Sequence, residues 1–356
     1  MNEKYLSPKS SGKNTCLSSF KAITAVLLIL LIPAFILPCI SGCKKGIAEK
    51  QTAQPEAIQK VTVVLDWFPN TNHTGIYVAK ENKYYEEEGL EIEIIQPSEG
   101  GSADLIAAGK GEFGISYQEQ VTYARTADTP LPIVAVAAII QHNTSGFASP
   151  AEKNINTPED FEDKKYGGWG SPMEEAMLKG LMEKYGADYK KLEIVNIGAA
   201  DFFTSVTKDV DFTWIYYGWD GVAAEIKNFD INFMLLQELD SQLDFYTPVI
   251  IVSEQTIRQD PALIKRFLNA TEKGYSFAIE NPEKAAEILL ADVAELDKEL
   301  VTASQKYLSG QYIADAPRWG EMKKEIWETF SNWMYENELL SRQLETDKAF
   351  TNDFLP

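Results

Sequence analysis

The chain has 356 residues and a formal net charge of −20, with 33 Lys and Arg against 53 Asp and Glu. Its 45% hydrophobic and 11% aromatic residues are enough to bury a core, which excludes a chain that is disordered throughout. Such an acidic chain repels phosphate backbones, so we expect no nucleic acid among its partners.

The first 42 residues differ from the rest in charge. They carry a net +3, which leaves −23 on residues 43–356. Several Lys residues precede an apolar run over residues 22–40, which ends in Ile40-Ser41-Gly42-Cys43. A basic region, an apolar core and small residues before a cut are typical of a secretory signal. An uncleaved membrane span fits the length of the run but not Pro33 and Pro38 within it.

The residues Ile40 to Cys43 resemble the lipobox of bacterial lipoproteins, in which the Cys sulfur is acylated and the chain is cut before it. The resemblance implies a palmitate-type lipid on Cys43 that anchors the protein at the outer face of the cell membrane or on its periplasmic side. Cys16 and Cys39 then leave with the leader. A folded part without free thiols excludes disulfides, cysteine catalysis and cysteine-ligated zinc. Residues 43–59 are predicted to be a flexible tether.

From Val61 onward, short apolar runs alternate with amphipathic stretches, which predicts an α/β fold with helices on both faces of the sheets. In the first unit the predicted strands are Val61–Leu65, Leu90–Ile95, Phe113–Ser116 and Ile133–Ile140. The predicted helices between them are Ile76–Glu88, Ser102–Ala108 and Glu119–Thr126. A second unit begins near Pro150, with predicted strands Lys165–Trp169, Leu192–Ile197, Asp211–Ile215 and Ile231–Leu236. Its predicted helices are Pro172–Tyr185, Asp201–Thr207 and Gly221–Lys227.

A strand over Tyr246–Val252 precedes a helical tail. The tail helices are predicted over Pro261–Glu280, Pro282–Leu290, Lys298–Leu308 and Trp319–Tyr335. This order predicts a bilobed protein with two mixed, mostly parallel sheets, in which residues 60–145 and 246–356 form lobe 1 and residues 146–245 form lobe 2. The chain then crosses between the lobes near Gln141–Ala148 and Asp244–Val249. Ligands of such folds bind in the cleft, at the carboxyl ends of the strands.

The densest group of polar and aromatic residues, residues 66–75, follows the first predicted strand. Asp66 can accept two hydrogen bonds, Trp67 can stack on a flat ring, and His73 can donate or accept a hydrogen bond. An ordinary turn with a helix cap would also use residues such as Asn70. Four ligand-competent side chains at the end of one strand favour a binding site.

Residues 167–175 form the matching turn in lobe 2. Ser171 is predicted to be a helix N-cap, and Glu174 completes a capping box with it. Glu175 is then left for a ligand. Two glutamates at a helix start suit an amine or amidine better than an anion.

Two more strand ends carry candidate ligand contacts. Trp214, Tyr216 and Trp219 can stack on a flat ring, although Trp214 can equally pack inward. At the other strand end, Gln118 and Glu119 can bond to a ligand edge, or Glu119 can complement the helix dipole.

The sequence offers little for metal binding or catalysis. Its two histidines, His73 and His142, have no Cys partner and no His-x-x-x-His spacing, so we expect no metal site. Phosphate-binding, nucleophile-elbow and dinucleotide-binding motifs are also absent from the sequence. We therefore expect a binding protein without a cofactor rather than an enzyme.

Residues 65–79 resemble the opening signature of solute-binding proteins for thiamine pyrimidine precursors, a family similar to eukaryotic pyrimidine-precursor synthases. The resemblance continues through Gly89-Leu90, 117–119, 145–148 and 219–221 and covers most of Val61 to Val252. It implies a type II periplasmic-binding-protein fold serving an ABC importer, with a permease and its ATPase as partners. It also implies a ligand such as a formylaminopyrimidine or hydroxymethylpyrimidine. We expect a monomer.

Carried over to matching positions, the resemblance implies a cleft with two sides. One side would be formed by Asp66, Trp67, Asn70, His73, Tyr117, Gln118 and Glu119. The opposite side would be formed by Ser171, Glu175, Trp214, Tyr216 and Trp219, where the match is looser. Relatives of this fold also carry riboflavin, sulfonates or other small solutes, so these remain alternative ligands.

Two other functions remain as alternatives. A pyrimidine-precursor synthase would need a Cys-rich motif like that of its eukaryotic relatives. If it used pyridoxal phosphate, it would also need a Lys to form the Schiff base. No Lys lies in the cleft motifs above. A sensor or adhesion lipoprotein with the same fold would need no permease.

Overall fold

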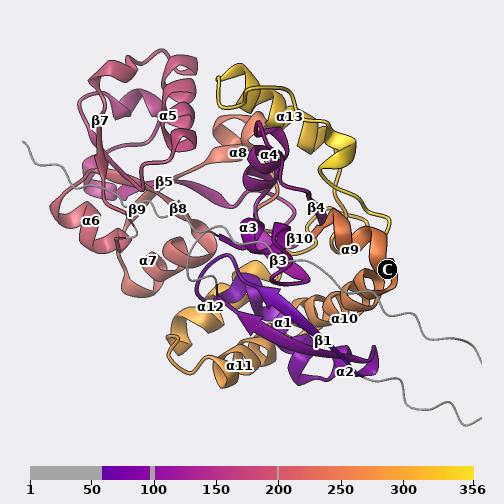
Figure 1. Cartoon of the computed structure of the whole chain (residues 1–356). Coiled ribbons are helices and arrows are strands. Elements are labelled where there is room, and N and C mark those ends of the chain that lie inside the picture. Colours follow the sequence, from indigo (N-terminus) through magenta and orange to yellow (C-terminus); the bar gives the residue numbers. More distant parts are fainter. Residues whose placement is uncertain (1–57, 97–100, 199) are drawn as a thin grey trace, which may run out of the picture. The chain divides into compact units, whose positions relative to one another are not determined.

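Two five-stranded sheets organise the chain (Figure 1). The computed structural model describes residues 58–96, 101–198 and 200–356. The predicted leader, the lipidation site Cys43 and the tether up to residue 57 therefore lie outside the described residues. The first sheet has the order β2-β1-β3-β10-β4 and the second the order β7-β6-β8-β5-β9.

Each sheet combines two parallel with two antiparallel pairs, so the predicted mixed sheets are confirmed, although parallel pairs do not predominate. In the first sheet β1 pairs in parallel with β2 and β3, whereas β10 runs antiparallel to β3 and β4. In the second sheet β6 pairs in parallel with β7 and β8, whereas β5 runs antiparallel to β8 and β9. The strands of the first sheet are β1 (Gln59–Val64), β2 (Leu90–Ile95), β3 (Phe113–Ser116), β4 (Ile133–Ala138) and β10 (Val249–Ser253). Those of the second are β5 (Ser145–Pro150), β6 (Lys165–Gly168), β7 (Glu193–Asn196), β8 (Phe212–Tyr216) and β9 (Ile231–Leu235).

Helices flank both sheets. The helices of the first unit are α1 (Thr74–Glu81), α2 (Tyr84–Glu87), α3 (Gly101–Ala107) and α4 (Gln118–Thr126). Those of the second unit are α5 (Pro172–Lys184), α6 (Phe202–Lys208), α7 (Val222–Lys227) and α8 (Leu236–Leu239). The tail contains α9 (Glu254–Gln259), α10 (Pro261–Glu280), α11 (Pro282–Asp292), α12 (Lys298–Leu308) and α13 (Lys324–Glu336). None of the helices among the described residues combines the length and apolar composition needed to cross a bilayer.

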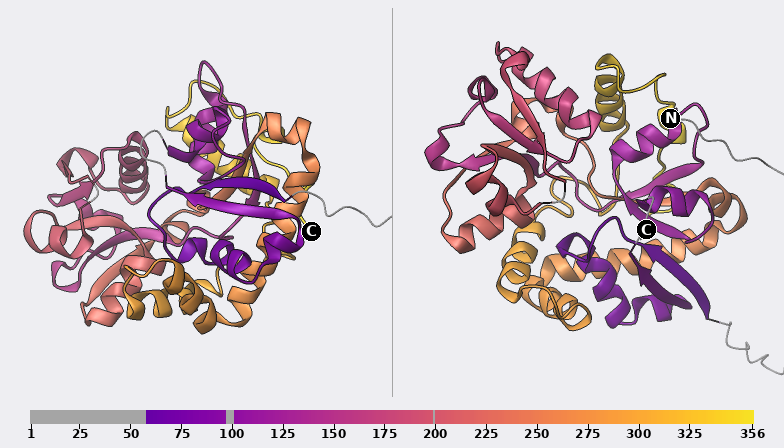
Figure 2. Two further views of the ribbon diagram at one scale, coloured as in Figure 1. Left: turned by 60° about the horizontal axis from the view of Figure 1, so that its bottom comes forward. Right: turned by 60° about the vertical axis from the view of Figure 1, so that its left-hand side comes forward.

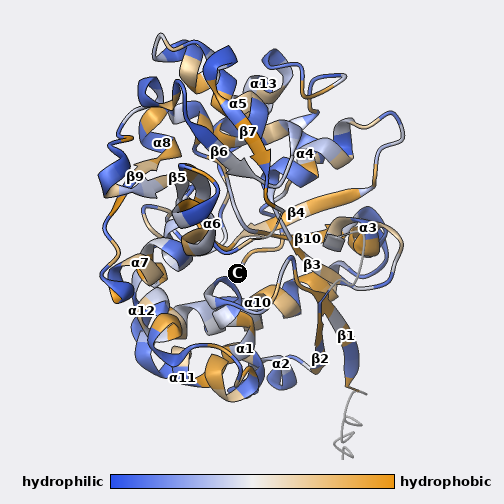
Figure 3. Ribbon diagram, turned by 90° about the vertical axis from the view of Figure 1, so that its left-hand side faces the viewer, coloured by the Kyte–Doolittle hydropathy of each residue, from blue (hydrophilic) through white to orange (hydrophobic). Residues whose placement is uncertain are grey.

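We call the first sheet with α1–α4 and α9–α12 lobe 1, and the second sheet with α5–α8 lobe 2. Both views of Figure 2 show the orange helices α10–α12 beside the indigo segment that contains β1 and α1. These contacts are extensive, because α1 packs on both α10 and α11. The strands provide the buried core, as the hydrophobic colouring of β4 in Figure 3 illustrates.

The last helix, α13, packs on both lobes. Its Trp327 belongs to a core cluster with first-sheet residues such as Ile133 and Val249. Its Phe330 and Trp333 belong to the cluster around the second sheet, where Phe330 stacks on Phe245 at 4.0 Å between ring centroids. The tail therefore supports both lobes and not lobe 1 alone.

Several segments differ from the predicted elements. The helix predicted over Trp319–Tyr335 begins only at Lys324, and the short helices α8 and α9 were not predicted. The single helix predicted over Ile76–Glu88 is interrupted at Lys83, whose φ of 64° lies in the left-handed region, and so forms α1 and α2. The predicted crossing near Gln141–Ala148 contains β5, an inner strand of the second sheet. Its small and polar residues carry no apolar alternation, so their burial depends on β8 and β9 on either side.

The two chain segments that connect the sheets are hydrogen-bonded to each other. The backbone N–H of Asn143 donates to Asp244 Oδ1 at 2.9 Å, and the Asn143 side-chain amide donates to the Leu243 carbonyl at 2.9 Å. His142 adds a charged link, with Nδ1 2.7 Å from Asp244 Oδ2 and Nε2 2.9 Å from Asp315 Oδ1. Lys323 Nζ lies 3.3 Å from the other oxygen of Asp315. Since both ring nitrogens face carboxylates, which only accept, His142 is a cation here.

The His142 links predict a defined pH dependence of stability. The hydrogen bond to Asp244 is the main cause that raises the pKa of His142 from 6.5 to about 9, against the opposing effect of partial burial. This stabilisation, up to about 3 kcal/mol, is fully present below pH 6.5 and is lost as the pH rises toward 9. In urea unfolding, His142→Gln should be destabilised at pH 6 and should lose this part of the pH dependence. Equal slopes for both proteins between pH 6.5 and 9 would contradict the assignment.

Candidate functional site

The turn after β1 holds a buried, ionised carboxylate. His73 Nε2 lies 2.7 Å from Asp66 Oδ1, and the backbone N–H of Asn70 donates to His73 Nδ1 at 3.2 Å. Because Nδ1 accepts, the ring proton lies on Nε2 and is donated to Asp66. Burial alone would raise the pKa of Asp66, but His73 and a hydrogen bond from Tyr117 outweigh it and lower that pKa below its ordinary value.

His73 and Asn70 shape this turn as much as they offer contacts. Asn70 caps the short 3₁₀ helix Thr71–His73 and forms a capping box with His73. His73 is fully buried, so its role in the cleft is to orient Asp66. Trp67 and Phe68 are instead exposed, at 55% and 64%, and their rings meet edge to face at 5.7 Å between centroids.

Three residues at the start of α4, Tyr117, Gln118 and Glu119, were predicted to contact the ligand, and the structure gives them different roles. Burial raises the pKa of Tyr117 well above its ordinary value, so its hydroxyl stays protonated and donates to Asp66. Gln118 is fully buried and accepts from the Tyr246 backbone N–H at 2.9 Å, while its amide donates to the Ile326 carbonyl at 3.3 Å. The structure thus places Gln118 as a link between elements of the fold and not in the cleft, contrary to our expectation.

Glu119 is the carboxyl group of α4 that faces the cleft. Burial, and then the negative charge of Glu174 in lobe 2, raise its pKa to about 7. The charges of Glu119 and Asp66 also act on Tyr216 of lobe 2. Carboxyl groups of lobe 1 therefore face residues of lobe 2 across the cleft.

In lobe 2 the structure buries Glu174 and exposes Glu175. The predicted capping box of Ser171 and Glu174 is confirmed, and Ser171 accepts from the Met173 N–H at 3.1 Å. Glu174 is nevertheless buried under the turn, where it accepts from Tyr166 at 2.6 Å and from the Trp169 N–H at 3.1 Å. Glu175, which we expected in the cleft, is exposed one position further along α5, and its charge acts on Tyr189. A step of one residue turns a side chain by roughly 100° around a helix, which accounts for the difference.

The end of β8 continues into one turn of π-helix, Tyr217–Gly221, a geometry frequent at functional sites. Tyr216 and Trp219 point from it toward lobe 1, and Trp219 packs on an apolar cluster that includes Tyr77 and Val301. Trp214 is only 8% exposed and lies in the core of lobe 2, beneath Trp169 at 5.2 Å between ring centroids. Trp214 therefore packs inward, as one of our two interpretations allowed.

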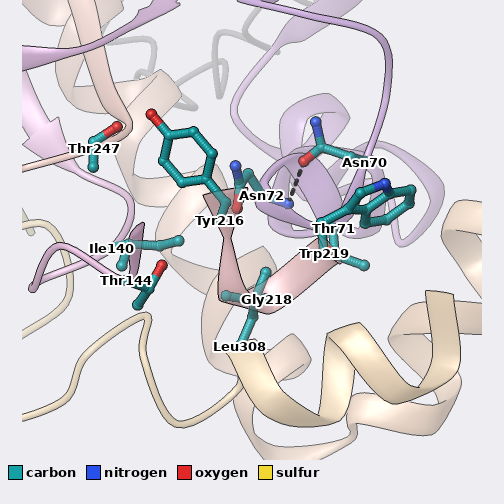
Figure 4. A pocket seen from close by; sticks show the side chains of 10 residues that line it. All are labelled: Asn70, Thr71, Asn72, Ile140, Thr144, Tyr216, Gly218, Trp219, Thr247 and Leu308. Carbon is teal, nitrogen blue, oxygen red and sulfur yellow. Dashed lines mark hydrogen bonds between the residues drawn. The ribbon is translucent and has the colours of Figure 1, made fainter. Parts of the chain in front are cut away.

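A small cavity of about 30 Å³ lies between these turns, which has room for water and is far smaller than an occupied small-molecule site (Figure 4). It is lined by Asn70, Thr71, Asn72, Ile140, Thr144, Tyr216, Gly218, Trp219, Thr247 and Leu308. In Figure 4 the Tyr216 hydroxyl points toward Thr247. Three residues predicted from sequence therefore line the cavity. Thr247 and Leu308 were missed because they come from the interlobe connection and from the tail, where no local pattern marks them.

Exposed aromatic residues gather at the strand ends of both lobes. Among the described residues, four of the six exposed large hydrophobic side chains are Trp67, Phe68, Trp169 and Tyr216. Trp169 was missed as a candidate contact, although its turn was singled out. Soluble proteins seldom expose such rings together unless they bind something. The carboxyl groups described above are accompanied by no Lys or Arg within these turns. No group of His, Cys, Asp and Glu within the described ranges is arranged to hold a metal ion.

Two α/β lobes joined by two crossing segments, with aromatic and acidic residues at the strand ends between them, define a bilobed solute-binding protein. The chain belongs to the NMT1/THI5-like family, which it matches over residues 70–285.

Relatives of this chain have different functions. It is 28% identical to the formylaminopyrimidine-binding protein of Halalkalibacterium halodurans over 345 residues, which covers 94% of this chain and 99% of the relative. It is 24% identical to the riboflavin-binding protein RibY of Chloroflexus aurantiacus over 350 residues, covering 93% and 96%. It is also 23% identical to the 4-amino-5-hydroxymethyl-2-methylpyrimidine phosphate synthase of Legionella pneumophila over 305 residues, covering 83% and 92%.

The fold is shared with solved solute-binding proteins. The alkanesulfonate-binding protein SsuA of Xanthomonas axonopodis pv. citri, bound to MOPS, superimposes with a TM-score of 0.62 at 13% identity. The superposition covers 83% of this chain and 99% of SsuA. The type II periplasmic-binding-protein fold predicted from the sequence is thus confirmed.

Proposed function

We propose that this protein binds a small, flat heterocycle with amino groups, of the formylaminopyrimidine or hydroxymethylpyrimidine kind, between its lobes. Its lobes close on the ligand, and the closed form delivers the ligand to an ABC permease and its ATPase. Closure requires that the ligand bind the closed state more tightly than the open one. Contacts from both lobes, such as Asp66 and Tyr216, supply this difference.

The observation that carries the proposal is the combination of carboxyl groups and exposed aromatic rings at the strand ends. Aromatic rings stack on a flat ligand, and carboxylates accept hydrogen bonds from its amino groups. Glu174 is buried and bonded to its own turn, so it contributes negative charge near Glu119 and no hydrogen bond to the ligand. Three carboxyl groups, Asp66, Glu119 and Glu174, disfavour sulfonates and phosphorylated pyrimidines by charge repulsion.

The similarity to a formylaminopyrimidine-binding protein along nearly the whole chain supports the same ligand class. A synthase is less well supported, although some relatives are synthases. The turns around the cleft described here carry no Lys for a Schiff base, and the sequence has no Cys after Cys43. We therefore propose a binding protein and not an enzyme.

Isothermal calorimetry on the full-length protein in detergent tests the ligand class. The panel is a formylaminopyrimidine, a hydroxymethylpyrimidine, thiamine, riboflavin and an alkanesulfonate. We expect micromolar or tighter binding of the aminopyrimidines and none of the sulfonate. Tight riboflavin binding without aminopyrimidine binding would replace the proposed ligand.

The charge of Glu119 predicts how affinity depends on pH. A ligand amino group donates a hydrogen bond to the ionised carboxylate of Glu119. Because the pKa of Glu119 is raised, this carboxyl group is mostly protonated below pH 7, and the ligand must displace its proton to bind. We expect affinity for an aminopyrimidine to rise about fivefold from pH 6 to pH 7, to rise about twofold more by pH 8, and then to level off. Glu119→Gln should bind more weakly and without this pH dependence. An unchanged pH profile in Glu119→Gln would exclude Glu119 as the acceptor.

We further propose that a lipid on Cys43 holds the monomeric protein at the outer face of the membrane. The signal-like leader and the small residues before Cys43 support this. A domain with net charge −23 would be repelled by an anionic surface while tethered to it. The mass of the N-terminal peptide of the mature protein tests the anchor, because an unmodified peptide would exclude it.

A further inference from the structure

Helix α12 of the tail lies behind the cavity and touches both of its sides. It packs on the 3₁₀ turn Thr71–His73 of lobe 1 and on the π-helical turn and α7 of lobe 2. Tyr307 of α12 lies against Tyr217, at 5.3 Å between ring centroids. A side chain at Gly218 would place its Cβ 2.9 Å from Leu308, so the π-helical turn rests directly on this helix. Figure 4 shows Gly218 beside Leu308.

Ser304 of α12 forms the polar part of this contact. Its side chain is fully buried, and its Oγ lies 2.6 Å from Thr71 Oγ1 and donates a hydrogen bond to the Gly218 carbonyl. A carbonyl only accepts, so the single Ser304 proton goes to Gly218, and Thr71 must donate to Ser304. The result is a directed chain of two hydrogen bonds from Thr71 through Ser304 to Gly218.

The lobe 1 end of this chain is itself held in place. Tyr312 donates to the Thr71 carbonyl at 2.6 Å, and Tyr275 donates to the Asn72 carbonyl at 2.7 Å. Both tyrosines come from the tail and are fully buried. The turn that carries Asn70, Thr71 and Asn72 therefore has a fixed position relative to α12.

We propose that Ser304 is a positioning residue for ligand binding, which holds the two cavity-lining turns at a set separation through its bonds to Thr71 and Gly218. The inference rests on the proposed function, because the π-helical turn that Ser304 contacts follows Tyr216, one of the aromatic residues assigned there to the ligand. Thr71 and Gly218 line the cavity, whereas Ser304 stands one layer behind it. The π-helical turn presents Tyr216 and Trp219 to a ligand, so its displacement would move two aromatic contacts at once.

Loss of the Ser304 hydroxyl leaves a buried carbonyl and a buried hydroxyl without partners. We expect Ser304→Ala to weaken aminopyrimidine binding about five- to tenfold, corresponding to the loss of two buried hydrogen bonds. Amide exchange of residues 217–221 in the unliganded protein should become at least about tenfold faster, because their turn is released locally. Thr71→Val, which keeps the bond from Ser304 to Gly218, should show about half of the effect on binding free energy.

The experiment measures Kd by calorimetry and amide exchange by mass spectrometry on the full-length protein in detergent. Ser309→Ala is the matched control, because Ser309 follows α12 and its hydroxyl donates to the Lys306 carbonyl of the same helix. A merely structural role lowers the melting temperature but leaves Kd well below that temperature unchanged. The proposal is supported if Ser304→Ala changes both Kd and the amide exchange rate while Ser309→Ala behaves like the unaltered protein.

Other outcomes also decide the matter. An unchanged Kd, or unchanged exchange over residues 217–221 in Ser304→Ala, overturns the proposal. If Ser304→Ala does not fold, Thr71→Val supplies the same two measurements with one bond retained. If the unaltered protein binds no aminopyrimidine, the proposed function fails, and exchange alone then decides whether Ser304 holds the turn.

Discussion

Replacing Asp66 by Asn is expected to weaken aminopyrimidine binding about 100-fold, because a charged hydrogen-bond acceptor in a buried site is lost. Asp66 is ionised in the structure, since His73 and Tyr117 both donate to it. An amide of nearly the same shape keeps the turn but has one acceptor oxygen and no charge. Calorimetry at pH 7.5 with a formylaminopyrimidine measures the effect.

Glu175→Gln is the matched control for Asp66→Asn. Glu175 is exposed on α5 and its charge acts on Tyr189, so its neutralisation should leave Kd within about twofold. The pair also separates the structural assignment from the sequence-based one, which placed both carboxylates in the cleft. Wild-type affinity in Asp66→Asn, or a loss confined to Glu175→Gln, would reverse the assignment.

Gly274→Ala is expected to destabilise the protein by about 3 kcal/mol or more, because it overpacks a contact between two helix backbones. Gly274 lies where α10 crosses α1, and an added Cβ would lie 2.0 Å from the Gly75 carbonyl oxygen. Gly75 in turn faces the Tyr275 ring, at 2.3 Å from where its own Cβ would be. Neither helix can yield without moving the ligand-binding turn that precedes α1. Chemical denaturation measures the change in the free energy of unfolding.

Gly180→Ala on α5 controls for the general effect of placing Ala in a helix. An added Cβ at Gly180 would meet its nearest atoms at 3.7 and 3.8 Å, which is ordinary contact. The same substitution there should stabilise the protein by about 0.5–1 kcal/mol, since Gly is costly in a helix interior. A Gly274→Ala protein as stable as Gly180→Ala would show that α1 and α10 do not approach as closely as described.

Much of the fold could be predicted from apolar runs and helix signals along the chain. The helix Pro261–Glu280 was predicted with the bounds of α10, because Pro suits the first helical position and the apolar periodicity persists to its end. Strand β5 could not be predicted, because its six buried residues include Ser, Gly and Pro. Only its two neighbouring strands account for their burial.

The candidate site shows the same division. Strand ends rich in Asp, Trp and Tyr pointed to a cleft, since side chains at the carboxyl ends of parallel strands meet at one edge of a sheet. The sequence could not show that the side-chain amide of Gln118 forms its hydrogen bonds with backbone groups of residues 246 and 326. Nor could it show that Gly168 leaves room beneath its turn for the carboxylate of Glu174, which a Cβ would meet at 2.4 Å.

The charge and the order of apolar runs are local properties, so the sequence was sufficient to indicate an acidic protein with two α/β lobes. The leader is local too, and export of the protein stays a prediction from it. The shape of the cavity depends on contacts between distant residues. Thr71 and Ser304 are 233 positions apart, and no local pattern links them. Only the packing of α12 against both lobes brings them within hydrogen-bonding distance, and so only the tertiary structure decides where the two aromatic and acidic turns stand.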